Sequence, residues 1–214
     1  MSSDTSPPHR LGLILVLSSP SGAGKTSLAK ALLANDDNLG LSISVTTRPP
    51  RDGEEDGKDY YFVSQDEFER RRDNGELLEW AVVFGNSYGT PRNAVETMIN
   101  AGQDIVFDVD WQGARQLTAQ NLPSLVKVFI LPPSAEVLEE RLRKRALDSM
   151  EVIAGRMQRA AAEISHWNEY NYTIINDDFD QSLKTLEAIL LAERHRTALQ
   201  AGLPDFVSRL EAVL

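Results

Sequence analysis

Two glycines, a lysine and a threonine stand close together in an order that suits phosphate binding. The stretch LSSPSGAGKTSL places Gly22 and Gly24 directly before Lys25 and Thr26. Backbone amides of such a loop bind anions at a helix N-terminus, the lysine reaches outer phosphates, and the hydroxyl ligates Mg²⁺. The pattern has another glycine where Ser19 stands, but a small residue suffices there if its φ is negative. We therefore interpret this stretch as a phosphate loop rather than a plain turn.

A carboxylate on a neighbouring strand would complete such a site. The stretch IVFDVD offers Asp108 and Asp110. Phosphate-loop proteins usually carry an aspartate at the end of a neighbouring buried strand, where it acts through Mg²⁺. Asp108 lies inside the apolar run, where an unpaired carboxylate is costly, and this favours it as the functional residue. For Asp110, capping of the following helix is an equally good interpretation.

Two arginines on a stiff segment could bind the group that accepts the phosphate. Arg48 and Arg51 are separated by two prolines, which hold the backbone extended, and Tyr60 follows closely. Two guanidinium groups on a rigid segment suit a phosphate monoester. Two solvated surface arginines are the alternative, and these residues alone leave it open.

A carboxylate within an apolar stretch suggests a base-reading group. The stretch LLEWAVVF places Glu79 between hydrophobic residues. A buried carboxylate needs a partner. Guanine offers its N1–H and its N2 amino group as paired donors, whereas adenine has no such pair. An ordinary edge-strand residue is the alternative for Glu79.

Alternating strands and helices predict the scaffold that positions these residues. A continuous apolar run at 11–17 and two further apolar runs at 104–109 and 125–131 are typical of strands buried on both faces. Helical spacing covers the ranges 25–33, 92–101, 112–121, 134–145, 151–167 and 181–199. Strands that alternate with helices predict an α/β fold with a parallel sheet covered on both faces.

Outside this core, other segments have sequence patterns that do not alternate between buried strands and helices. Short strand-like pieces in residues 42–90 predict a small mixed β insert, and residues 141–160, without a strand, predict a helical flap. We expect residues 1–9 to be a disordered tail. Apolar residues recur near the C-terminus at intervals of three or four, at Leu199, Leu203, Phe206, Leu210 and Val213. This amphipathic pattern predicts either docking on the core or an oligomer contact.

The composition excludes several classes of protein. A chain of 214 residues, 42% hydrophobic and 25% charged, suits one compact soluble domain. No apolar run reaches the roughly 18 residues of a membrane span, and no signal peptide is expected, so we expect a cytoplasmic protein without a membrane partner. The absence of cysteine excludes disulfides, thiolate zinc sites and a cysteine nucleophile. A net charge of −10 disfavours nucleic acid as a partner but allows a small anion where arginines converge. The histidines suggest no metal site, and the three tryptophans are expected to pack.

Six motifs together resemble the guanylate kinase family. The stretches SSPSGAGKT, SVTTRPPRDGEEDGKDYYFV, EWAVVFGNSYGTPR, FDVDWQG, FILPPS and INDDFD occur in the family's order, from about residue 13 to 194. The match is closest to the bacterial enzymes. It implies a P-loop NTPase-like core with a five-stranded parallel sheet (10–41, 91–140 and 161–214), a GMP-binding insert (42–90) and a helical lid (141–160). It also implies transfer of the γ-phosphoryl group of ATP to GMP with Mg²⁺, giving ADP and GDP.

The resemblance also implies roles for individual residues. The phosphate-loop residues expected to bind ATP are Ser19, Pro20, Ser21, Gly22, Ala23, Gly24, Lys25 and Thr26, with Thr26 on the metal and Asn176 near the nucleotide. The residues expected to bind GMP are Arg48, Arg51, Tyr60 and Tyr88 on its phosphate, Ser44, Glu79 and Thr90 on guanine, and Asp108 at the GMP and metal side. The catalytic group is Lys25, Arg141, Arg145, Arg156 and Asp108. No strong base is needed, because the attacking phosphate oxygen of GMP is already ionised at neutral pH.

The sequence departs from the family at the lid. The family usually reads Arg-Leu-x-Gly-Arg-Gly, whereas here Lys144 and Ala146 replace both glycines, which should stiffen the helix end. Ser87 stands where the family often has tyrosine.

Two other classes of function remain in view. A catalytically inactive scaffolding module would bind phosphopeptides at the GMP site, but the intact phosphate loop argues against it. A kinase for a phosphorylated ribose would not need the guanine readers Ser44, Glu79 and Thr90.

Overall fold

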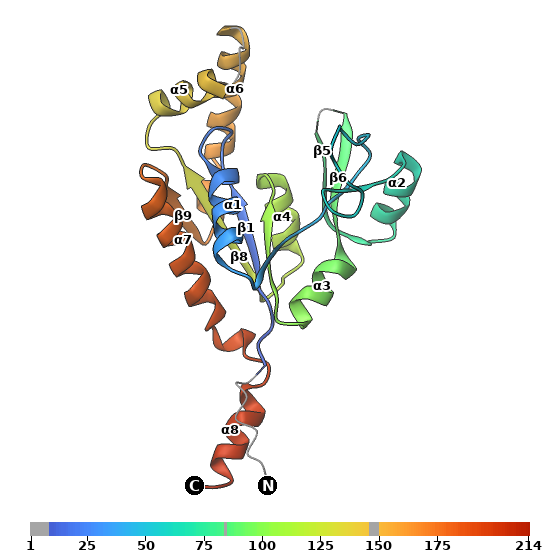
Figure 1. Cartoon of the computed structure of the whole chain (residues 1–214), viewed down its shortest axis with the longest axis vertical. Helices are drawn as coiled ribbons and strands as arrows, with labels where there is room; N and C mark the ends of the chain where they lie inside the picture. Colours follow the sequence, from blue (N-terminus) through green and yellow to red (C-terminus); the bar gives the residue numbers. More distant parts are fainter. Residues whose placement is uncertain (1–8, 84, 146–149) are drawn as a thin grey trace.

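The larger of two sheets forms the centre of the molecule (Figure 1). The computed structural model describes residues 9–83, 85–145 and 150–214. The strands of this sheet are β1 (Ile14–Ser18), β2 (Leu39–Leu41), β7 (Asp104–Asp108), β8 (Leu125–Leu131) and β9 (Tyr172–Ile175). They run parallel in the order β2-β7-β1-β8-β9. The predicted five-stranded parallel sheet is confirmed.

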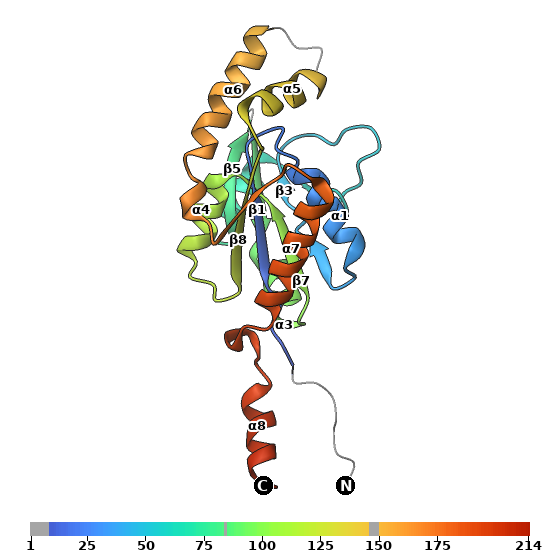
Figure 2. The ribbon, with the colours of Figure 1, turned by 90° about the vertical axis from the view of Figure 1, so that its left-hand side faces the viewer.

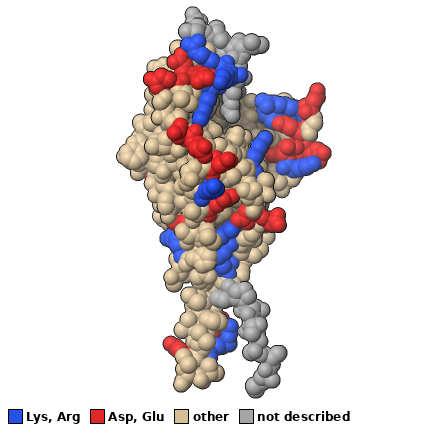
Figure 3. Space-filling model, turned by 60° about the vertical axis from the view of Figure 1, so that its left-hand side comes forward, with Lys and Arg blue, Asp and Glu red and all other residues tan. Residues whose placement is uncertain are grey.

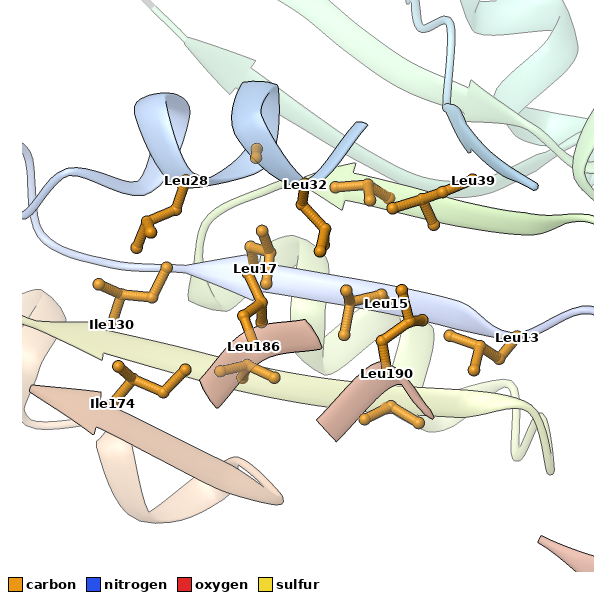
Figure 4. Packing of buried hydrophobic residues seen from close by; sticks show 14 of the residues in the cluster. Leu13, Leu15, Leu17, Leu28, Leu32, Leu39, Ile130, Ile174, Leu186 and Leu190 are labelled. Carbon is orange, nitrogen blue, oxygen red and sulfur yellow. The ribbon is translucent and has the colours of Figure 1, made fainter. Parts of the chain in front are cut away.

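Helices cover both faces of this sheet. The helices of the described chain are α1 (Lys25–Asn35), α2 (Gln65–Asp73), α3 (Arg92–Asn100), α4 (Trp111–Ala119), α5 (Ala135–Arg145), α6 (Met150–Ile164), α7 (Phe179–Arg194) and α8 (Leu203–Glu211), with 3₁₀ turns at Trp167–Glu169 and Thr197–Leu199. On one face α1 and α7 pack against leucines of β1 (Figure 4), and on the other α3 and α4 pack against Ile14 and Val16. Because neighbouring strand residues point to opposite faces, β1 between two layers of helices must be apolar throughout.

Two short strands of the main sheet were missed. We predicted no strand at β2 or β9, which have three and four residues and lie at the edges of the sheet. Edge strands this short carry no readable periodicity, and their pairing with β7 and β8 stabilises them instead. The predicted helix 151–167 ends at Ile164, and the predicted helix 181–199 spans Phe179–Arg194, with the Asp178 side chain capping its start.

The second sheet is small and mixed, as predicted. Its strands are β3 (Val45–Thr46), β4 (Tyr61–Phe62), β5 (Leu77–Val83) and β6 (Asn86–Pro91), in the order β4-β3-β6-β5. β3 runs parallel to β4 and antiparallel to β6. The hydrophobic core of this small sheet is formed by Val45, Phe68 and Leu77. We did not predict β6, because its sequence NSYGTP has low strand propensity. Pairing with β3 on one side and β5 on the other compensates for this.

The C-terminal helix α8 projects away from the sheets (Figures 1 and 2). Leu199 is fully buried in the core, but Val207, Leu210 and Val213 are exposed. Docking of this helix on the core was therefore a wrong prediction, and an oligomer contact stays a prediction. Within the described ranges, no helix combines the length and apolar character that crossing a membrane requires.

A buried ion network closes the end of the sheet opposite the phosphate loop. Asp104, the first residue of β7, is fully buried. Its Oδ1 accepts hydrogen bonds from Arg10 Nη1 at 2.7 Å and the Leu13 amide at 2.8 Å. Its Oδ2 accepts one from Arg194 Nε at 2.6 Å, and Arg194 also pairs with Asp36 at 2.6 Å. The network joins β7 to the chain before β1 and to the end of α7.

Replacing Asp104 by alanine is expected to lower the free energy of unfolding by about 3–5 kcal/mol. The reason is that two arginines and a backbone amide lose a buried partner together. Urea denaturation followed by circular dichroism measures the change. Asp37→Ala is the matched control, since Asp37 is exposed nearby and lies outside the network. A change no larger than that of the control would contradict this account.

Candidate active site

Two adjoining cavities lie at the carboxyl ends of β1 and β7. The larger, of about 840 Å³, is lined by residues of the small sheet, of the β7–α4 connection and of α6. The smaller, of about 280 Å³, is lined mainly by the predicted phosphate loop. They share Ser21, Asp108, Asp110 and Glu163. Ligands of parallel α/β sheets bind at this edge, so the pair of cavities is the candidate active site.

The loop between β1 and α1 has the backbone that its glycines permit. Gly22 and Gly24 have φ of 93° and 101°, in the left-handed region that favours glycine. A Cβ on Gly24 would lie 2.3 Å from Asn176 Nδ2, so a side chain there would also clash. Asn121 is the one non-glycine residue with positive φ in the described part of the chain. Ser19 therefore has no positive φ, which is the condition under which serine can replace the glycine of the phosphate-loop pattern.

Two polar side chains hold this loop from outside. Asn176 is buried, and its Nδ2 donates a hydrogen bond to the Ala23 carbonyl at 2.7 Å. Arg141 of α5 donates to the same carbonyl at 3.5 Å and to the Asn176 carbonyl at 3.3 Å. These contacts connect the loop both to α5 and to the segment after β9.

Lys25 and Asp108 form an ion pair in the lining of the smaller cavity. The Lys25 Nζ also lies 3.5 Å from the Val109 carbonyl. The burial that its place in the apolar run implied for Asp108 was wrong: Asp108 is the last residue of β7, and its side chain is 36% exposed. Asp110 caps α4, accepting hydrogen bonds from the Gln112 and Gly113 amides at 2.9 and 3.0 Å. Both aspartates nevertheless line both cavities.

Glu79 is a buried carboxylate in the wall of the larger cavity. It is 5% exposed, and its Oε1 accepts a hydrogen bond from the Thr90 hydroxyl at 2.7 Å across β5 and β6. A Cβ on Gly113 would lie 3.1 Å from its other oxygen, so glycine leaves room for the carboxylate. Burial raises the pKa of Glu79 to about 7, with a smaller contribution from Asp110 and an opposing one from Thr90. This group therefore changes charge near neutral pH.

Two arginines of the insert donate hydrogen bonds to Glu54, Arg48 through its side chain and Arg51 through its backbone amide. Arg48 donates two hydrogen bonds to Glu54, at 2.8 and 2.9 Å, and lies 5.4 Å from the Tyr60 ring centre. The Arg51 amide donates to the same carboxylate at 2.8 Å, and its side chain is exposed. Among the described residues that line the larger cavity, Tyr60 and Tyr88 are present and the two arginines are not.

Three residues of α6, Arg156, Arg159 and Glu163, line the larger cavity. Arg156 was predicted from the sequence, whereas Arg159 and Glu163 were not. The spacing of three and four residues places all three on one helix face, a signal that was available in the sequence. Figure 3 shows Lys and Arg side chains gathered near the top of the molecule, where α5, with Arg141, Arg143 and Lys144, and α6 lie. The side chain of Arg145 and the predicted lid departure at Ala146 lie outside the described residues.

Comparisons with known proteins agree on one family. The model of the family described as "Guanylate kinase" matches residues 12–193. The chain belongs to the guanylate kinase family. It is 54% identical over 202 residues to the guanylate kinase of Novosphingobium aromaticivorans, covering 94% of this chain and 91% of that protein. It is also 54% identical over 203 residues to the guanylate kinase of Zymomonas mobilis, covering 95% and 94%. The crystal structure of guanylate kinase from Anaplasma phagocytophilum has a TM-score of 0.75 at 41% identity, covering 95% and 97%.

For this guanylate kinase family member, the residues expected from the resemblance divide into two groups. Those that line a cavity are Ser19, Pro20, Ser21, Gly22, Gly24, Lys25, Thr26, Ser44, Tyr60, Glu79, Tyr88, Asp108 and Arg156. Those absent from the described lining are Ala23, Arg48, Arg51, Thr90, Arg141 and Asn176. Three of the second group support the site from outside: Thr90 bonds Glu79 of the first group, and Arg141 and Asn176 bond the Ala23 carbonyl of the phosphate loop.

GMP affinity is expected to fall about tenfold between pH 8 and pH 6. A carboxylate with a pKa of about 7 is mostly ionised at pH 8 and mostly protonated at pH 6, and only the ionised form accepts both donors of guanine. Titration calorimetry across this range measures the change. Glu79→Gln is the control, because it keeps the titration of the nucleotide's own phosphate. An equal slope in that variant would contradict the assignment.

Proposed function

We propose that this chain transfers the γ-phosphoryl group of ATP to GMP, giving ADP and GDP, as a step of purine nucleotide metabolism in the cytoplasm. The observation that carries the proposal is the position of Glu79. A buried carboxylate, bonded to Thr90, faces the cavity that adjoins the phosphate loop. One face of the site thus suits guanine, and the other suits a triphosphate.

In this proposal the acceptor lies in the larger cavity. Glu79 and Thr90, with Ser44, bind the guanine edge, and Tyr60 and Tyr88 reach its phosphate. Arg48 reaches that phosphate only after its guanidinium leaves Glu54, whereas Arg51 bonds Glu54 through its backbone amide, so its exposed side chain can reach the phosphate with that bond in place. Residues 42–90 act as the GMP-binding insert.

The donor lies along the phosphate loop in the smaller cavity. Backbone amides of the loop and the α1 N-terminus bind its phosphates, and Lys25 exchanges Asp108 for a phosphate oxygen. Charge on the transferred group is neutralised by Lys25, Arg141, Arg145 and Arg156, with residues 141–160 acting as the lid. No general base takes part, because the attacking oxygen of GMP is already ionised.

The oxygen donors at this site suit Mg²⁺. Thr26, at the first turn of α1, lines the smaller cavity beside Asp108 and Asp110. Within the described residues, no group of three or more His, Cys, Asp or Glu side chains forms a metal cage. Mg²⁺ in nucleotide-binding sites is usually held by one or two protein oxygens together with substrate phosphates, and such a site needs no cage of this kind. Thr26 would hold the ion there, and the ion's charge would help to neutralise that of the phosphates.

The two sides of the cavity are expected to approach each other when both nucleotides bind. This closure would bring the arginines of the insert and of α6 to the same phosphate groups. Small-angle scattering profiles with and without both nucleotides test it, and unchanged profiles would contradict it.

A coupled assay for ADP tests the proposed function directly. With ATP and Mg²⁺, the purified chain is offered GMP, AMP, UMP, CMP and ribose 1,5-bisphosphate in parallel. We expect ADP with GMP alone. Activity on the ribose compound would keep the donor site but refute the acceptor assignment. No activity in a folded sample would refute the proposal and favour a binding module.

A further inference from the structure

Four side chains outside both cavities join the start of α4 to the segment that follows α6. Trp111 and Arg115 belong to α4, and His166 and Glu169 follow the end of α6. We call these four residues the α4–α6 cluster. None of them lines either cavity.

The Trp111 ring is the centre of the α4–α6 cluster. The His166 ring stacks on it, with ring centres 4.0 Å apart and planes at 17°. The Arg115 guanidinium carbon lies 4.8 Å from the centre of the Trp111 ring. Stacking and a cation–π contact thus act on one aromatic side chain.

Ion pairs join the other three residues of the α4–α6 cluster, and a hydrogen bond links Glu169 to the main sheet. Arg115 donates two hydrogen bonds to Glu169, at 2.7 and 2.5 Å, and His166 Nδ1 lies 2.8 Å from Glu169 Oε1. Arg115 lowers the pKa of Glu169 to about 2, with burial opposing and His166 assisting, so this carboxylate stays charged. Lys127 of β8 donates to the Glu169 carbonyl at 2.6 Å.

The α4–α6 cluster is connected to the candidate active site both through α4 and through the end of α6. Trp111 follows Asp110, which lines both cavities. The His166 amide donates to the carbonyl of Glu163 at 3.2 Å, and Glu163 also lines both cavities. A shift of this cluster would therefore move groups on two walls of the site.

The part of α6 nearer its N-terminus has a different support. Met157 and Ala160 pack against Leu138 and Leu142 of α5. In Figure 2, α6 rises beyond the main sheet, and its lower end lies beside α4. Arg156 and Arg159 are thus carried on a length of helix supported by α5, while the C-terminal end of α6 is fixed by the α4–α6 cluster.

We propose that the α4–α6 cluster is the pivot of α6 and positions its arginines over the transferred phosphoryl group. The cluster holds the C-terminal end of α6 in one place while the rest of the helix moves with α5. Arg156 and Arg159, which lie two to three turns from the pivot, then reach the phosphates in a reproducible orientation. The four cluster residues are positioning residues, and the inference rests on the proposed function.

The test uses His166→Ala and Arg115→Ala, with His166→Phe as the conservative variant. Each is compared in kcat, in affinity for GMP alone, and in affinity for a pentaphosphate that links adenosine to guanosine. Because misplaced catalytic groups cost up to about 100-fold in rate, we expect kcat and pentaphosphate affinity to fall about 10- to 100-fold in the alanine variants. GMP affinity should stay close to the wild-type value, and His166→Phe should restore most of kcat because it keeps the ring stack.

Arg72→Ala is the matched control. The Arg72 guanidinium lies 5.4 Å from the ring of Trp80 in the insert, so the variant removes a similar cation–π contact far from α6. It should leave kcat unchanged. If His166→Ala fails to fold, Arg115→Ala gives the same test, since the Arg115 side chain is 53% exposed.

Three results would overturn the proposal. One is an unchanged kcat and pentaphosphate affinity in the alanine variants, even with a lower melting temperature, which would make the cluster merely structural. Another is a loss of GMP affinity as large as the loss of pentaphosphate affinity. The third is a phenylalanine variant no better than the alanine variant. Failure of the proposed function is distinguishable, because it would appear in the wild-type protein as a lack of GMP-dependent ADP formation.

Discussion

Replacing Lys25 by alanine is expected to lower kcat by about 100- to 1,000-fold, the usual cost of losing one preorganised charge-stabilising group. Lys25 lines the smaller cavity, and its ammonium is paired with Asp108 and lies near the Val109 carbonyl. Its charge matters most while the phosphoryl group moves, so kcat should fall more than the KM values change. Steady-state kinetics with GMP and ATP measure both quantities.

Lys30→Ala is the control for this variant. Lys30 lies on the same helix, α1, and is exposed. It should keep the wild-type kcat. If Lys25→Ala also kept it, the assignment of Lys25 to the transferred phosphoryl group would be wrong.

The second large effect is expected from Glu79→Gln, which should lower kcat/KM for GMP by about 10- to 100-fold. A hydrogen bond to a charged group contributes roughly 1.5–3 kcal/mol, and here one acceptor becomes a donor that faces a donor of guanine. The preference for GMP over other nucleoside monophosphates should weaken at the same time. Parallel kinetics with GMP, AMP and inosine monophosphate, which lacks the N2 amino group, measure the change.

Stability separates this effect from simple damage to the fold. Burial raises the pKa of folded Glu79 to about 7, above the value of an exposed glutamate. The folded state therefore binds this proton more tightly, and ionisation of Glu79 costs stability as pH rises from about 4.5 through 7. At pH 8, Glu79→Gln should thus be at least as stable as the wild type.

The control for the second variant is Glu55→Gln, in the same insert. Its side chain is 67% exposed and pairs with Lys58 at the surface. It should change neither the rate nor the preference among bases. If Glu79→Gln kept full selectivity for GMP, another group would have to read guanine.

Local chemistry alone determined the phosphate loop and the central strands. The phosphate loop is specified by two glycines, a lysine and a threonine that are close together in the sequence. The structure shows both glycines in the left-handed conformation that this loop needs. The apolar runs of β1, β7 and β8 were readable because strands buried on both faces are mostly apolar. Such features depend on contacts and dihedral angles within a few residues, so the sequence contains them directly.

Contacts between distant segments decided the rest. The exposure of Asp108 and the strand β6 between two partners each depend on which segment lies alongside. The α4–α6 cluster joins residues about 50 positions apart, as the Arg115–Glu169 hydrogen bonds show. No local propensity encodes such a meeting, because its free energy arises only when the sheet has brought α4 and the end of α6 together. The sequence by itself thus determined the phosphate loop and the class of fold, whereas only the tertiary structure decided how the walls of the site are held.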